Sequence, residues 1–92
     1  MTHLEPLFFE NAIGKERVVD EVANLDDAFA AMRRFCDERN FKIPYVRFLI
    51  EEYPMEESVA WRISFDVGSW SEFFYIYFDT FEDASKFLIN KK

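Results

Sequence analysis

Glycine and histidine are scarce in this 92-residue chain, and their scarcity excludes several kinds of site. Only Gly14 and Gly68 are present, whereas phosphate-binding and dinucleotide-binding loops need several glycines at fixed spacings. His3 is the sole histidine, so a two-histidine metal site cannot form within one chain, and a nucleophilic triad would depend on that one residue. We therefore expect a protein that is not an enzyme, with no catalytic residue, no metal and no cofactor.

Cysteine and long apolar runs are nearly absent as well. Cys36 is the only cysteine, so no disulfide can form within the chain, and an apolar position on a helix favours a buried thiol. The longest apolar run, residues 73–78, is far shorter than the roughly 20 residues of a membrane-spanning helix. No basic stretch followed by an apolar one marks a secretion signal. These features predict a cytoplasmic protein that does not interact with a membrane.

Acidic residues outnumber basic residues by 18 to 11, which gives a formal net charge of −7. Proteins that grip nucleic acid neutralise its phosphates with Lys and Arg, so this balance argues against a nucleic-acid partner. The negative charge is least balanced between residues 48 and 83, where nine acids stand against a single base, Arg62. Such a surface suits a basic partner or imitates the phosphates of a nucleic acid, but it also serves simply for solubility.

The length predicts one domain over residues 1–92, because domains usually contain about 100–150 residues. Within it we expect a core over 24–92, preceded by an irregular or β segment over 1–23. That segment contains two candidate strands, 7–9 and 17–22. The 12 Phe, 4 Tyr and 2 Trp supply a large apolar area for so short a chain.

Two helices are predicted by apolar residues that recur at the helical period, over residues 25–39 and 81–90. Asn24 precedes the first helix and Thr80 the second, and each is followed three positions later by Asp. This pattern is typical of helix N-termini. Asn40 is expected to end the first helix, because Asn tolerates the left-handed conformation used there.

Three strands are predicted between the helices, over residues 44–51, 58–67 and 71–78. Their short connections favour an antiparallel meander. The fold class is therefore α+β, with two layers in the order (β)(β)αβββα: a three-stranded antiparallel sheet, which the N-terminal strands can extend, and two helices on one face. Between these layers we expect to find Phe29, Met32, Phe35, Val59, Trp61, Ile63, Phe65, Phe81 and Leu88.

The second face of this sheet is unusually apolar for a solvated surface. Alternation along the strands places there Tyr45, Arg47, Leu49, Arg62, Ser64, Phe73, Tyr75 and Tyr77. Exposed apolar patches of this kind usually mark an interface. Three explanations are open: the N-terminal segment covers the face, a second copy of the chain covers it, or the face binds a partner through its Tyr and Arg side chains.

Paired carboxylates follow the first of these strands, but nothing in the sequence orients them for acid–base catalysis. Together with the second face they form our candidate partner surface: Glu51, Glu52, Glu56, Glu57, Tyr45, Arg47, Arg62, Tyr75 and Tyr77. The resulting hypothesis is a non-enzymatic protein that acts by protein–protein interaction and forms a homodimer. The alternatives are a nucleic-acid-binding module that uses the aromatic face, and an acidic mimic of nucleic acid.

The element order over residues 25–90 resembles the double-stranded-RNA-binding domain, which shares the α-β-β-β-α topology. That family holds phosphates with a Lys-rich start to its last helix, whereas residues 80–86 here are acidic, so the resemblance implies the fold and not the function. Residues 66–76, Asp-Val-Gly-Ser-Trp-Ser-Glu-Phe-Phe-Tyr-Ile, resemble small uncharacterised proteins of phages and mobile elements of Gram-positive bacteria. This second resemblance implies a cytoplasmic bacterial setting and, for a mobile element, a regulatory or host-inhibiting accessory role.

Overall fold

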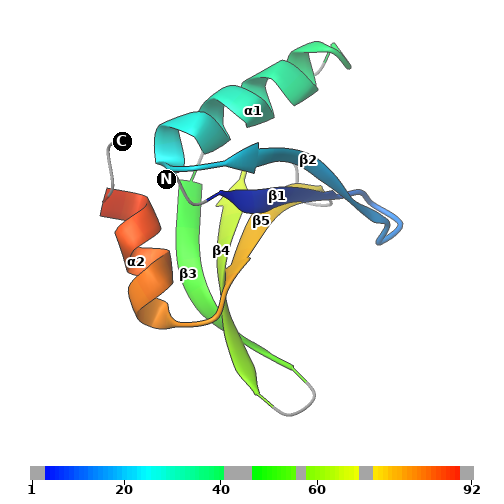
Figure 1. The fold of residues 1–92 in the computed structure, drawn as a ribbon. Coiled ribbons are helices and arrows are strands. Elements are labelled where there is room, and N and C mark those ends of the chain that lie inside the picture. The colour runs from blue at the N-terminus through cyan, green and yellow to red at the C-terminus, as the bar shows by residue number, and fades with distance from the viewer. Residues whose placement is uncertain (1–3, 41–46, 56–57, 69–71, 90–92) are drawn as a thin grey trace.

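The computed structural model describes residues 4–40, 47–55, 58–68 and 72–89 (Figure 1). Its elements are β1 (Glu5–Glu10), β2 (Glu16–Val22), α1 (Leu25–Asp37), β3 (Arg47–Pro54), β4 (Val59–Asp66), β5 (Phe73–Phe78) and α2 (Phe81–Ile89). The α+β class and the element order are as predicted. The expected three-stranded sheet, however, has five strands in the order β2-β1-β5-β4-β3, and every neighbouring pair is antiparallel.

Both helices begin at the predicted caps. The side chain of Asn24 accepts a hydrogen bond from the backbone N–H of Asp27 at 2.9 Å. The hydroxyl of Thr80 accepts one from the N–H of Asp83 at 3.0 Å. Each cap satisfies a backbone donor that the first helical turn leaves unpaired. Asn40, with a φ of 56°, has the left-handed conformation expected just beyond α1.

The core lies between the helices and one face of the sheet. α1 packs beside β2, and α2 packs against β4 and β5 (Figure 1). Phe35 and Met32 are buried in this layer as predicted, and Phe29, Trp61 and Leu88 pack against it partly buried. Two expected core residues are instead exposed. Val59 is 48% exposed and Phe81 is 52% exposed, because each lies where its element begins, at the border of the layer.

The N-terminal hairpin extends the sheet and covers only part of its second face. β1 pairs with β5, and the β1–β2 register shifts between Leu7 and Phe8. Figure 1 shows β1 and β2 running across the direction of β3 and β4, so the sheet is strongly twisted. Phe9 reaches the core side of this sheet, where it contacts Phe35 with ring centroids 4.7 Å apart. The first of the three explanations for the apolar second face therefore holds only in part: Phe8 of the hairpin stacks on Tyr75, whereas Leu49 remains 56% exposed.

Candidate functional site

The candidate site lies on the sheet face opposite the helices, which we call the open face. Directly opposed residues of neighbouring strands share a face, so the strand registers identify its members. They include Phe8, Arg47, Leu49, Glu51, Tyr53, Arg62, Ser64, Asp66, Phe73, Tyr75 and Tyr77. The alternation predicted for this face is therefore confirmed over the part of the chain that the structure describes. Tyr45, which was predicted to join it, lies outside the described residues.

Tyr75 is the centre of the open face, yet it is fully buried. Its ring stacks on Phe8 with centroids 5.6 Å apart, and it meets Phe73 at 5.4 Å and Tyr77 at 5.2 Å. The twisted sheet brings these neighbours around it without a second layer. Tyr75 was predicted to contact a partner directly, and this prediction is wrong because its own neighbours cover the ring.

The hydroxyl of Tyr75 is held by two carboxylates of the N-terminal hairpin. It donates to Glu16 and lies 3.3 Å from a carboxylate oxygen of Glu10. Burial, and then the hydrogen bond to Glu16, raise the pKa of Tyr75 well above its ordinary value. Tyr75 is thus a neutral donor that joins β5 to both strands of the hairpin.

A polar cluster beside Tyr75 is formed by Arg62, Glu51 and Ser64. The Nε and Nη2 atoms of Arg62 donate to one carboxylate oxygen of Glu51 at 3.1 and 2.7 Å, and the Ser64 hydroxyl donates to the same oxygen at 2.8 Å. The guanidinium also lies over the rings of Tyr53, at 4.7 Å, and Tyr75, at 5.2 Å. The Arg62 side chain is only 17% exposed, so these contacts hold it within the protein surface.

The arrangement of this cluster keeps Glu51 and Arg62 charged and does not favour proton transfer. Hydrogen bonds from Arg62 and then from Ser64 lower the pKa of Glu51. A carboxylate with a lowered pKa is a weak base and does not activate the Ser64 hydroxyl as a nucleophile. The geometry therefore favours a structural role for these three residues.

The lowered pKa of Glu51 predicts a dependence of stability on acid. The folded-state pKa of Glu51 lies below the ordinary value of about 4.3. The contribution of its ionised carboxylate to folding stability is therefore fully present above that value and is lost as the pH falls through the folded-state pKa. Below about pH 4.3, we expect the free energy of unfolding to fall less steeply with decreasing pH in Glu51→Gln than in the unmodified chain. Urea denaturation at a series of pH values measures this, and parallel curves for the two proteins would contradict it.

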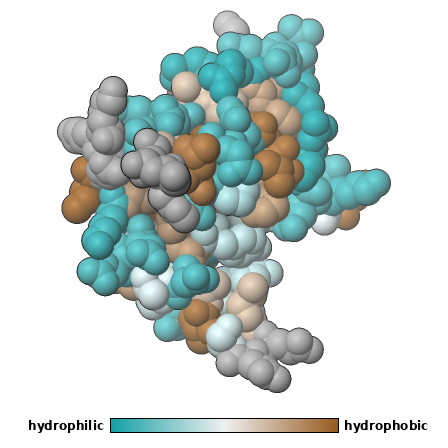
Figure 2. All heavy atoms as spheres, in the orientation of Figure 1, coloured by the Kyte–Doolittle hydropathy of each residue, from teal (hydrophilic) through white to brown (hydrophobic). Residues whose placement is uncertain are grey.

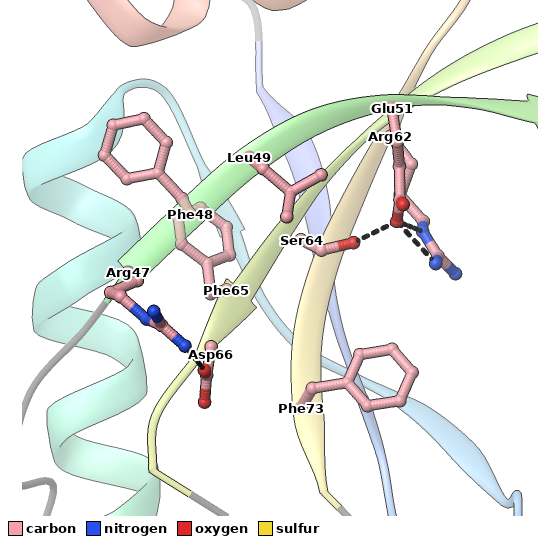
Figure 3. Close-up of a pocket in the computed structure, with 9 residues that line it drawn as sticks. All are labelled: Arg47, Phe48, Leu49, Glu51, Arg62, Ser64, Phe65, Asp66 and Phe73. Carbon is pink, nitrogen blue, oxygen red and sulfur yellow. Dashed lines mark hydrogen bonds and ion pairs between the residues drawn. The ribbon is translucent and has the colours of Figure 1, made fainter. Parts of the chain in front are cut away.

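An open hollow of about 450 Å³ adjoins the cluster (Figure 3). Leu49 and Phe73 project into it from β3 and β5, and Leu49 is 56% exposed. At the far end Arg47 and Asp66 form an ion pair of 2.8 Å. Figure 2 shows the molecular surface recessed between the main body and the β3–β4 hairpin. The hollow therefore has an apolar centre bordered by two neutralised ion pairs.

The acidic residues predicted to form one contact surface are not brought together. Glu51 faces the open side and is bonded to Arg62, whereas Glu52 is opposite Trp61 and projects from the other face of β3. Successive strand residues point to opposite faces, which separates the two carboxylates. Glu56 and Glu57 lie outside the described residues.

The remaining chemistry-bearing groups add no second site. Cys36 is buried as predicted, and burial, followed by the charge of Asp37, raises the pKa of its thiol. Among residues 4–40, 47–55, 58–68 and 72–89, no group of three or more His, Cys, Asp or Glu side chains is placed to hold a metal. Neither α1 nor α2 is long and apolar enough to cross a membrane.

Sequence reasoning missed the cross-strand partners that complete the site. Asp66 pairs with Arg47, and Tyr53 lies under the Arg62 guanidinium. A signal for the first contact was available in the sequence: once the β3–β4 register is fixed at any one pair, Arg47 must fall opposite Asp66, as Glu51 falls opposite Arg62. Comparisons of the chain with protein-family models, with curated proteins and with solved structures find no match.

Proposed function

We propose that this chain is a non-enzymatic protein that acts by binding a protein partner through the hollow of the open face. The observation that carries the proposal is the exposed Leu49 beside Phe73, in a recess bordered by the Arg47–Asp66 and Arg62–Glu51 pairs. Protein interfaces commonly have an apolar centre and a polar rim. A partner that inserts one apolar side chain would match this arrangement.

The chemistry of the partner follows from the charges. The four charged residues of the rim neutralise one another in pairs, so the hollow itself is complementary to an uncharged group. The chain as a whole has a net charge of −7, and Glu52 is exposed on the opposite face of β3. The partner segment is therefore an aliphatic or aromatic residue flanked by basic residues, whose approach the acidic chain favours.

Nucleic acid fits the open face less well than protein does. Arg47 and Arg62 are each bonded to a carboxylate, so neither is available to a phosphate without breaking an ion pair. Base stacking needs an accessible ring; that of Tyr75 is covered, and that of the exposed Tyr53 already packs against the Arg62 guanidinium. The nucleic-acid mimic is also weakened, because Glu51 is neutralised internally. Regulation or inhibition of the partner is the form of activity we propose for such a binding protein.

Replacing Phe73 with glutamate tests this function. We expect Phe73→Glu to lose at least about 90% of the partner captured by the tagged chain, because a charged side chain replaces the apolar ring that a partner side chain would contact. The matched control is Ile13→Glu, which adds the same charge at an exposed position of the β1–β2 turn. The readout is the quantity of each bound protein from bacterial lysate, repeated with the purified partner.

Circular dichroism of both variants shows whether they keep the fold. Equal capture by Phe73→Glu and by the unmodified chain would refute the hollow as the binding site. Salt-sensitive binding of single-stranded nucleic acid by the purified chain would favour the nucleic-acid alternative instead.

A further inference from the structure

The two edges of the sheet are protected to different degrees. β2, at one edge, contains a register irregularity opposite β1, is packed by α1, and has four charged residues, Glu16, Arg17, Asp20 and Glu21. Natural proteins use such features to prevent pairing with another chain. β3, at the other edge, keeps an unbroken register over its eight residues and exposes 43% of Phe48 and 56% of Leu49. Among the described strands, β3 pairs with β4 alone.

The outward backbone groups of β3 can be identified from one hydrogen bond. The N–H of Met55 donates to the C=O of Ser58 at 2.8 Å, so these opposed residues form a hydrogen-bonded pair. Such pairs alternate with non-hydrogen-bonded pairs along an antiparallel ladder. Because the register is continuous, Phe48, Ile50 and Glu52 direct their N–H and C=O groups away from β4. This edge therefore presents three alternate residues ready to bond another strand.

We propose that the occupant of this edge is a second copy of the chain, with the two β3 strands antiparallel and Leu49 opposite Leu49 on a two-fold axis. In this register Phe48 of each copy is a hydrogen-bonded partner of Ile50 in the other, and both have outward backbone groups. The pairing makes one ten-stranded sheet from two five-stranded sheets. The interface is isologous, as two-fold dimers require. This inference concerns self-association and does not depend on the partner proposed for the hollow.

Charge complementarity selects the second copy and this register. Glu51 of one copy falls opposite Arg47 of the other. Within each copy, Glu51 faces Arg62 of β4 and Arg47 faces Asp66. A row of side chains across the four strands therefore reads Arg62 and Glu51 of one copy, then Arg47 and Asp66 of the other. Positive and negative charges alternate along this row, and the two-fold axis generates a second, identical row. Opposite charges directly across strands stabilise a sheet.

The neighbouring two-fold registers lack this complementarity. With Ile50 on the axis, Glu52 would face Phe48 and Glu51 would face Leu49, which places carboxylates against apolar side chains. With Glu51 on the axis, two like charges would meet, which destabilises the pairing. The register centred on Leu49 also places the hollows of the two copies next to each other across the axis, because Leu49 lines each hollow.

Two oppositely charged variants at the axis test the proposal. Sedimentation velocity of the purified chain over rising concentration should show a dimer, and Leu49→Lys and Leu49→Glu should each halve the mass by placing like charges at the centre. Mixing the two variants should restore a dimer that contains one of each. The control Met55→Lys, which adds a charge at an exposed position just beyond β3, should remain dimeric.

Amide hydrogen exchange on the unmodified chain gives an independent readout. The N–H groups of Phe48 and Ile50 should exchange fast in dilute samples and slow by at least about tenfold as the dimer forms, whereas the N–H of Leu49, bonded to β4, should be protected throughout. A monomer at every concentration would overturn the proposal. So would a dimer that survives Leu49→Lys, or mixed variants that stay monomeric.

Discussion

Replacing Tyr75 with alanine should lower the free energy of unfolding by about 3–5 kcal/mol, which is the usual cost of truncating a large buried aromatic residue. Tyr75 is fully buried although it lies on the face opposite the helices. Phe8, Phe73 and Tyr77 surround it, so they would lose their shared contact. The substitution would leave a cavity inside a small secondary core that binds β5 to β1.

Tyr75→Phe removes the hydroxyl and keeps the ring, so it measures the contribution of the hydroxyl alone. We expect a loss of about 1–3 kcal/mol, because Glu10 and Glu16 would face each other without their shared donor. Urea denaturation followed by circular dichroism measures both variants. A loss below about 1 kcal/mol for Tyr75→Ala would contradict the packing described for the open face.

The second large effect is expected at Arg62. Arg62→Ala should destabilise the fold by about 2–4 kcal/mol, somewhat less than the loss typical of a fully buried ion pair because Glu51 retains partial exposure. The loss includes the guanidinium contacts with Tyr53 and Tyr75, which lie 4.7 and 5.2 Å away. It also leaves Glu51 with Ser64 as its remaining side-chain donor in the cluster.

Arg34→Ala is the matched control for this experiment. Arg34 forms an ion pair of similar length, 2.8 Å, with Asp20, but both side chains are largely exposed. Exposed pairs contribute about 0–1 kcal/mol, so this variant should be nearly as stable as the unmodified chain. Equal losses for Arg62→Ala and Arg34→Ala would show that the open-face cluster has no special energetic role.

Much of the fold can be predicted from local patterns in the sequence. Alternating residues identify β4, and the caps at Asn24 and Thr80 locate both helix starts. These signals arise from residues that are close together in the sequence, so they hold whatever the tertiary arrangement of the elements. The place of the N-terminal hairpin has no such signal: β1 pairs with β5 across more than 60 positions of sequence, and several arrangements would bury Phe9 equally well.

The burial of Tyr75 shows why the open face was only partly predictable. An alternating strand indicates which side a residue faces, but exposure depends on how strongly the sheet twists and which strand becomes its neighbour. Phe8 covers Tyr75 only because β1 joins the sheet beside β5. The Arg62–Glu51 contact, in contrast, follows from the hairpin register alone.

Binding of a partner at the open face can be located residue by residue on the folded chain. Backbone amide NMR spectra of the labelled protein, with and without the purified partner, report which residues change environment. We expect the largest shifts at Leu49, Ser64 and Phe73, around the hollow. Shifts confined to the solvent-facing sides of α1 and α2, with these three amides unchanged, would contradict the proposal that the open face binds the partner.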